Sequence, residues 1–300
     1  MENVSDHTLQ INAWIALCQI DRTFPDSLRR LGYTADIIDP KFVHDGEEVN
    51  PDLILTSRGN NHSIVIDCKS KTLKEHQNDR YEAIHESPRF LLSRGIVSSA
   101  EATGDYDAEF AYSSFSDLSS NPLLPDNDFA VVHFDEDAQQ YIIRTLGGYE
   151  FNLAELQAEF PIHTETKRVP TDYFPFDVGT GDDDYRQFTI SILQSTVHVA
   201  LDQDEFDADD LLEDAHPLWV DLDADMKREL RAHTETIIRE YQRKGLDEHI
   251  QKVQAGSKDE WKVVSKSLQA LQRKVDEFVD DVQIELEQTK LTDDWETDEQ

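Results

Sequence analysis

The chain has 300 residues and carries 63 Asp and Glu against 28 Lys and Arg, a formal net charge of −35. Its length allows one large domain or two ordinary ones, each with a sizeable core. It contains no apolar run of bilayer-spanning length, and its first residues lack the basic segment and apolar core of a signal peptide, so we expect a soluble, cytoplasmic protein without a membrane partner. Both cysteines, Cys18 and Cys68, lie in apolar segments, which argues against a disulfide framework.

The acidic charge is compatible with three classes of protein. Disorder is disfavoured because regular helix and strand patterns cover most of the chain. A second class is an acidic protein that mimics nucleic acid. The third is a halophilic protein, in which carboxylates hold a hydrated surface and molar salt screens their repulsion. We favour the halophilic class, because the acidic residues are spread along the chain and lysine is sparse.

Helix and strand patterns alternate over the first half of the chain. In chain order we expect a helix over 8–20, a short helix over 26–32, a strand over 33–39, a polar loop over 40–50, two strands over 53–56 and 63–69 joined by a hairpin turn, a helix over 73–85, and strands over 108–115, 129–134 and 140–146. This order predicts an α/β fold with a mixed sheet flanked by helices.

The second half of the chain is mostly helical in pattern. A loop with three prolines and a run of aspartates, 161–185, predicts a linker between a domain over 1–160 and a helical region over 186–300. Within that region, 223–245 reads as an amphipathic helix that ends at Gly245. The segment after it suits a small hairpin wing, although we weight the helical pattern that follows more strongly.

The last segment carries an apolar stripe with heptad spacing. Its members lie three and four residues apart: Trp261, Val264, Leu268, Leu271, Val275, Phe278 and Val282. The stripe predicts either a long helix packed on its own domain or a coiled-coil homodimer through residues 258–290, and both interpretations stay open.

The expected hairpin has charged residues where a buried strand ends. The run Ser63–Ile66 is apolar enough for a sheet interior, yet it continues into Asp67 and Lys69, which share one face of the strand. If the hairpin pairs as expected, Asp52 approaches Asp67, and two neighbouring carboxylates repel unless they share a proton or a cation. Mg²⁺ prefers oxygen ligands, and Lys69 beside it would stabilise charge on a phosphate. The alternative is a plain surface ion pair at a strand end.

Pro51-Asp52, followed after a spacer by Asp67-Cys68-Lys69, resembles the PD-(D/E)XK signature of the restriction-endonuclease-like nuclease superfamily. The expected order of helix, strand, hairpin, helix and strand is similar to that family's core over roughly residues 5–115. The resemblance implies that Asp52 and Asp67 bind Mg²⁺ or Mn²⁺ and that Lys69 is catalytic. Gln77 and Tyr81 resemble the QxxxY element of the helicase-nuclease-associated branch, which implies that both support the site, although the gap after Lys69 is shorter than in that branch.

Other positions are assigned a role in metal or nucleic-acid binding. The family often supplies a further acid from the leading helix, and Asp21 is the nearest match, with a helix-capping role as the alternative. The stretch from 66 to 96 has six basic and five acidic residues, and the stretch from 226 to 244 has six basic residues and three glutamates. Both stretches therefore carry a net positive charge in a chain whose net charge is negative, as a phosphate-binding surface requires. The predicted nucleic-acid contacts from these stretches are Lys71, Lys74, Arg80, Arg228 and Arg231. Ion pairing within the helix is the alternative for the second stretch.

We therefore expect a Mg²⁺-dependent nuclease that hydrolyses phosphodiester bonds in DNA, with a C-terminal helical domain for DNA targeting or dimerisation. A role in defence or repair is implied by the family resemblance alone. The alternatives are a catalytically inactive nuclease fold that serves as a DNA-binding or assembly module, and an acidic protein that mimics nucleic acid.

Overall fold

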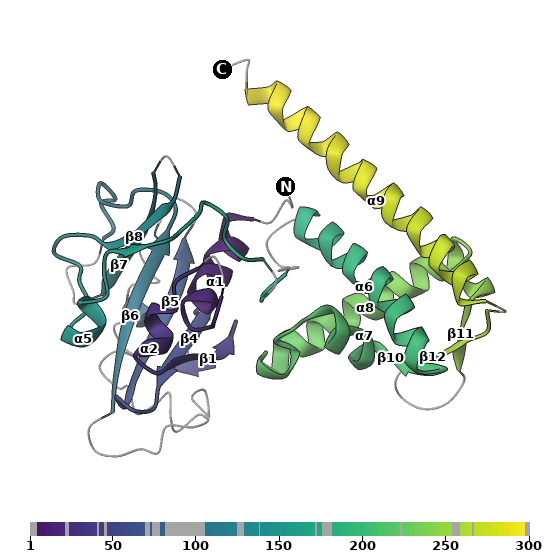
Figure 1. Ribbon diagram of the computed structural model, residues 1–300, viewed down its shortest axis with the longest axis horizontal. Coiled ribbons are helices and arrows are strands. Elements are labelled where there is room, and N and C mark those ends of the chain that lie inside the picture. Colours follow the sequence, from purple (N-terminus) through teal and green to yellow (C-terminus); the bar gives the residue numbers. More distant parts are fainter. Residues whose placement is uncertain are drawn as a thin grey trace. The chain divides into compact units, whose positions relative to one another are not determined.

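The computed structural model divides the chain into two compact units (Figure 1). The N-terminal unit comprises Asp6–Tyr173 with Asp221–Asp225, and the C-terminal unit comprises Met1–Ser5, Phe174–Val220 and Met226–Gln300. The structure describes residues 5–21, 24–40, 42–44, 47–69, 73, 79–81, 106–124, 129–137, 139–171, 173–175, 182–222, 224–253, 259–265 and 267–297. Within these ranges, none of the helices has an apolar stretch long enough to cross a bilayer.

The N-terminal unit is built on a seven-stranded mixed sheet in the order β1-β4-β5-β6-β7-β8-β9 (Figure 1). Its strands are β1 (Tyr33–Ile38), β4 (Leu53–Ser57), β5 (His62–Lys69), β6 (Asp107–Ser114), β7 (Ala130–Glu136), β8 (Tyr141–Thr145) and β9 (Ile162–His163). Strands β1, β4 and β5 pair antiparallel, β5, β6 and β7 run parallel, and β8 and β9 return antiparallel. The expected α/β fold with a mixed sheet is confirmed.

Within the described ranges, the helices beside the sheet include α1 (Asp6–Leu17), α2 (Ser27–Arg30) and α5 (Ala154–Gln157). Helix α1 contacts β5, and its Trp14 is fully buried. Helix α2 ends before Gly32, whose φ of +78° is a left-handed conformation that glycine adopts without steric cost. Of the helix expected over 73–85, Asp79–Tyr81 are helical, and most of the remainder lies outside the described residues.

The polar loop expected over 40–50 is instead a short hairpin of β2 (Phe42–His44) and β3 (Glu47–Val49). Each strand has three residues, which is too short for an alternating apolar pattern to be recognised. This expectation was wrong for that reason.

An aromatic cluster packs on the same face of β5 and β6 as the site described below. Tyr81 lies 5.3 Å from Phe110 between ring centroids, and Phe110 lies 5.5 Å from Phe129. All three side chains are buried, as is Val65 on β5. Because burying an apolar side chain stabilises the fold by about 1.5–3 kcal/mol, this cluster holds the two parallel strands in register.

The C-terminal unit combines helices with a three-stranded antiparallel sheet in the order β10-β12-β11. Its elements are α6 (Asp182–Asp202), β10 (Glu205–Asp207), α7 (Ala208–Ala215), η1 (Trp219–Asp221), α8 (Ala224–Arg243), η2 (Leu246–Glu248), β11 (Ile250–Val253), β12 (Glu260–Val263) and α9 (Leu268–Thr297). Asp207 caps α7 through its carboxylate, which accepts from the backbone N–H groups of Asp209 and Asp210. The suggested hairpin wing is present as β11 and β12.

The heptad stripe is divided between two elements, contrary to the expectation of one helix. Trp261 lies in β12, fully buried against Phe206 of β10, and α9 begins only at Leu268. From Leu271 to Val282 the stripe is buried within the unit, where α9 packs on α6. That stretch does not present a free dimer seam, so the homodimer through residues 258–290 stays a prediction without support from this packing.

Candidate functional site

The β4–β5 hairpin brings Asp52 and Asp67 together. The ladder pairs Leu53 with Ile66, and the next step of the same register places Asp52 opposite Asp67 on one face. Asp52 is tied into the ladder at both ends, because its N–H donates to the Ile66 carbonyl at 2.9 Å and its Oδ2 accepts from the Cys68 N–H at 2.5 Å. The carboxylate therefore has a fixed position just before the first residue of β4.

Lys69 lies beside the same pair of carboxylates. Its Nζ is 2.6 Å from Asp67 Oδ2, and it lies 5.6 Å from the centroid of the Tyr112 ring. The side chains of Lys69 and Asp67 are 11% and 7% exposed, so this ion pair is largely screened from water. Tyr81 completes the group: its hydroxyl donates to the Asn50 carbonyl at 3.3 Å and also hydrogen-bonds Asp67.

The pKa values of the two carboxyl groups are shifted in opposite directions. Burial, together with the neighbouring charge of Asp52, raises the pKa of Asp67 to about 7. Burial acts on Asp52 as well, but hydrogen bonds from His7 and from the Cys68 N–H outweigh it and hold the pKa of Asp52 below its ordinary value. Near neutral pH the site thus holds one firmly ionised carboxylate and one that readily gains or loses a proton.

Helix α1 supplies two site residues that the sequence analysis missed. His7 Nε2 lies 3.0 Å from Asp52 Oδ1. Gln10 Nε2 donates to the Lys69 carbonyl at 3.1 Å, and Gln10 Oε1 accepts from Ser113 Oγ at 2.8 Å. Gln10 thus connects β5 to β6 beneath the lysine. The signal in the sequence was a set of polar residues, Thr8, Gln10 and Asn12, close to the apolar run that follows them in the helix, because buried polar groups need partners.

Asp21 is not brought to this group. Its Oδ1 accepts from the Phe24 N–H at 3.0 Å and its Oδ2 from the Tyr173 hydroxyl at 3.2 Å. Because α1 rises by 1.5 Å per residue, the ten residues from His7 to Leu17 put Asp21 at the other end of the helix, about 15 Å away. Asp21 therefore lies in the segment between α1 and α2, and the N-cap position of α2 is Asp26, so the helix-capping alternative is not supported for α2.

The remaining predicted positions are dispersed. Gln77, Lys71 and Lys74 lie outside the described residues, and Arg80 is partly exposed next to Tyr81 in the chain. In the C-terminal unit Arg228 is exposed on α8, whereas Arg231 is paired with Asp209 and lies over the Trp219 ring.

The donor atoms at the site suit a hard divalent cation. In the part of the chain that the structure describes, no three His, Cys, Asp or Glu side chains converge as a complete metal site. Mg²⁺, however, is usually held by one or two carboxylates with water and substrate phosphate as its other ligands. A cation between Asp52 and Asp67 would also remove the repulsion that contributes to the raised pKa of Asp67. The two aspartates therefore fit Mg²⁺ or Mn²⁺.

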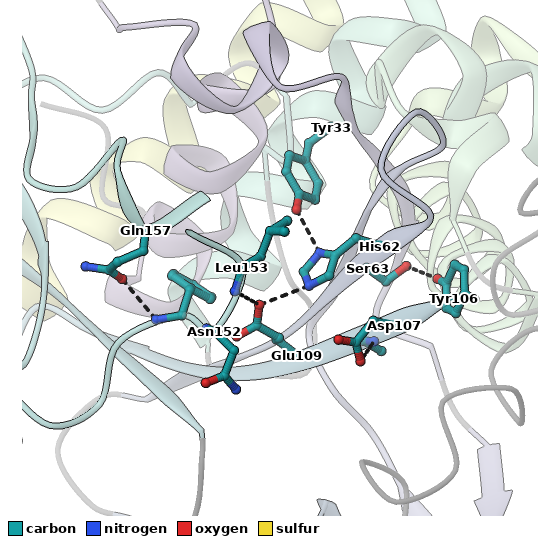
Figure 2. Close-up of polar contacts among 11 residues, drawn as sticks. Tyr33, His62, Ser63, Tyr106, Asp107, Glu109, Asn152, Leu153 and Gln157 are labelled. Carbon is teal, nitrogen blue, oxygen red and sulfur yellow. Dashed lines mark hydrogen bonds and ion pairs between the residues drawn. The ribbon is translucent and has the colours of Figure 1, made fainter. Parts of the chain in front are cut away.

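A second polar group lies at the opposite end of β5. His62 lies between Tyr33 and Glu109 (Figure 2). Its Nδ1 is 2.7 Å from the Tyr33 hydroxyl and its Nε2 is 3.0 Å from Glu109 Oε1. Glu109 also accepts from the backbone N–H groups of Asn152 and Leu153, just before α5. Although burial opposes it, these donors lower the pKa of Glu109. The His62 and Glu109 side chains are only 3% and 2% exposed, and their hydrogen bonds join the strands to the segment before α5.

Comparison with known proteins places the N-terminal unit in a family. The model of the MJECL32 domain matches residues 6–174, more than half of the chain. The chain belongs to the MJECL32 domain family. The MJECL32 domain of this chain thus contains the whole Asp52–Asp67–Lys69 group. A second model, a domain of unknown function named DUF8601, matches residues 181–294.

Among curated proteins, the chain is 28% identical over 209 residues to Uncharacterized protein MJECL32 of Methanocaldococcus jannaschii. The aligned part is 66% of this chain and 47% of the relative, so the chain spans about half the length of that protein. No solved structure matches the chain. These descriptions name no activity for either part of the chain.

Proposed function

We propose that the MJECL32 domain of this chain is a divalent-metal-dependent nuclease that hydrolyses phosphodiester bonds in DNA. The observation that carries the proposal is the pairing of Asp52 with Asp67 across the β4–β5 hairpin, with Lys69 Nζ at 2.6 Å from Asp67. It is supported by the order of α1, β1, β4, β5 and the parallel strand β6, which is similar to the PD-(D/E)XK core.

Asp52 and Asp67 are the residues that would hold Mg²⁺ or Mn²⁺. When bound there, the cation would polarise the scissile phosphate and lower the pKa of a bound water. Asp52 is suited to this role because it stays ionised and is fixed by the Cys68 N–H and by His7. Asp67 loses its proton near neutral pH, so it becomes a full ligand only in that range or above.

Lys69 would act on the reacting groups themselves. Its ammonium group is held by Asp67 and lies next to the Tyr112 ring, so it enters the reaction with a fixed position. From there it can hydrogen-bond the attacking water or the phosphate oxygen on which charge develops. The Tyr81 hydroxyl also hydrogen-bonds Asp67, which restricts the orientation of that carboxylate.

A cleavage assay tests the proposal. Full-length protein in molar KCl is incubated with linear and circular DNA and Mg²⁺, alongside the variants Asp67→Asn and Lys69→Met. Lys167→Met serves as the matched control, because Lys167 is a more exposed lysine paired with Glu136 in the same unit. We expect cleavage by the wild type and the control, and a loss of at least about 100-fold in both site variants. Equal cleavage by all four proteins, or none by any of them, contradicts the proposed nuclease activity.

A further inference from the structure

The C-terminal unit has consecutive helices followed by a hairpin. Helix α7 precedes α8, and the strands β11 and β12 come directly after α8 and η2. In helix-turn-helix proteins the second helix lies in the major groove, and here the short helix η1 separates α7 from α8. The 20 residues of α8 form a rod about 30 Å long, and a helix is narrow enough for a major groove about 12 Å wide.

Helix α8 has one buried face, and its remaining residues carry a small net positive charge. Its buried face is apolar and includes Met226, Leu230, Ile237 and Tyr241. The helix carries five Lys and Arg against four Asp and Glu, in a chain whose net charge is −35. The sign of the charge is therefore reversed where α8 faces solvent.

Basic residues of α8 and β11 border one groove of about 430 Å³. The groove is lined by Arg239, Gln242, Arg243, Asp247, Gln251 and Lys252. Its polar side chains are the types that contact phosphate and sugar oxygens in protein–DNA complexes. The groove joins the helix to the hairpin, so both elements contribute to a single surface.

An ion-pair network orients two of these cations. Asp259, at the start of β12, accepts from Arg239 Nε at 2.9 Å and pairs with Lys252 Nζ. The Asp259 side chain is 14% exposed, whereas Arg239 and Lys252 are 45% and 49% exposed, so the carboxylate lies beneath the two cations. Arg239 has five N–H donors and Lys252 has three, which leaves donors for a phosphate after the carboxylates are satisfied.

Ion pairing within the helix does not explain the whole surface. It accounts for Arg239 with Glu235 and for Lys244 with Glu240, both four residues apart. Arg243, by contrast, is exposed and forms no ion pair with any described residue, although it lines the same groove. An unpaired arginine beside an oriented lysine from another element is an arrangement that suits an external anion.

We propose that the groove formed by α8 and β11 binds the phosphate backbone of double-stranded DNA. Duplex DNA fits better than duplex RNA, because the deep, narrow major groove of A-form RNA excludes a helix. The inference goes beyond the proposed function, since it concerns a surface of the other unit and needs neither Asp67 nor catalysis.

The test is fluorescence anisotropy of a labelled DNA duplex with full-length protein in EDTA, over a series of KCl concentrations. The variants are Arg243→Gln, Lys252→Gln and the double substitution. Arg144→Gln is the matched control, because Arg144 is a half-exposed arginine on β8 paired with Asp135. EDTA removes divalent metal, so DNA binding is measured without cleavage at the proposed nuclease site.

We expect each groove substitution to reduce the slope of log affinity against log salt by about one, and the double variant to bind roughly tenfold more weakly. Arg144→Gln should bind like the wild type. Failure of the wild type to bind duplex DNA, wild-type affinity in the double variant, or equal affinity for duplex RNA would each overturn the proposal. None of these results depends on whether the protein cleaves DNA.

Discussion

The raised pKa of Asp67 predicts a specific pH dependence of stability. With a pKa of about 7, Asp67 in the folded protein keeps a proton over a range in which the unfolded chain, with an ordinary aspartate, has lost it. The folded state binds more protons there, so the contribution of Asp67 to the free energy of unfolding falls as pH rises toward 7. Each pH unit corresponds to about 1.4 kcal/mol, so two units between pH 5 and pH 7 amount to about 3 kcal/mol.

Asp67→Asn replaces the titratable carboxyl with an amide of nearly the same size. Relative to the wild type, the variant should therefore gain about 3 kcal/mol between pH 5 and pH 8 in the absence of divalent metal. The measurement is urea unfolding in molar KCl followed by tryptophan fluorescence, to which buried Trp14 contributes the signal of the N-terminal unit. The same substitution in an Asp52→Asn background should show a smaller gain, because one of the two causes of the raised pKa is then absent.

A difference between wild type and Asp67→Asn that stays constant from pH 5 to pH 8 would refute this reasoning. It would mean that Asp67 is not held in a buried position beside a charged Asp52. A Mg²⁺ concentration of about 100 times the dissociation constant should restore about 2.7 kcal/mol to the wild type at pH 8 and little to the variant.

Three further predictions follow from the contacts of other residues. His7→Gln should weaken Mg²⁺ binding about tenfold in calorimetry, because Asp52 loses the group that orients it, and unchanged affinity would show that His7 has no such role. Glu109→Gln should destabilise the protein by about 3 kcal/mol in urea, because His62 and two backbone N–H groups lose a charged acceptor; a change within error of zero would contradict this. Asp207→Ala should lower the free energy of unfolding by about 1 kcal/mol in thermal unfolding, because α7 loses its N-cap. Asp204→Ala is the control, since Asp204 does not cap α7, and it should leave stability unchanged.

The hairpin that carries the site could be predicted because its signals are local. The apolar runs on either side of the turn define β4 and β5, and alternation along a strand puts Asp67 and Lys69 on one face. The pairing of Asp52 with Asp67 then follows from the position of the turn. No long-range information was needed for these three residues.

The contributions of α1 could not be predicted in the same way. Whether His7 or Asp21 reaches the site depends on how far the helix extends and which of its ends lies over β5, and neither is encoded in a local pattern. Trp261 was misplaced for a related reason. An apolar residue every three or four positions fits a helix, but the first part of this stripe lies in strand β12. The strand β10 that pairs with it lies more than fifty residues earlier in the chain.

The most direct measurement of the central claim, that Asp52 and Asp67 share one divalent cation, is Mn²⁺ binding followed by electron paramagnetic resonance. At pH 8 we expect one tightly bound Mn²⁺ per chain in the wild type and in Lys167→Met. Both Asp52→Asn and Asp67→Asn should lose that ion, and Mg²⁺ should displace it from the wild type. Tight Mn²⁺ binding that survives both aspartate substitutions, or no tight binding in the wild type, would contradict the account.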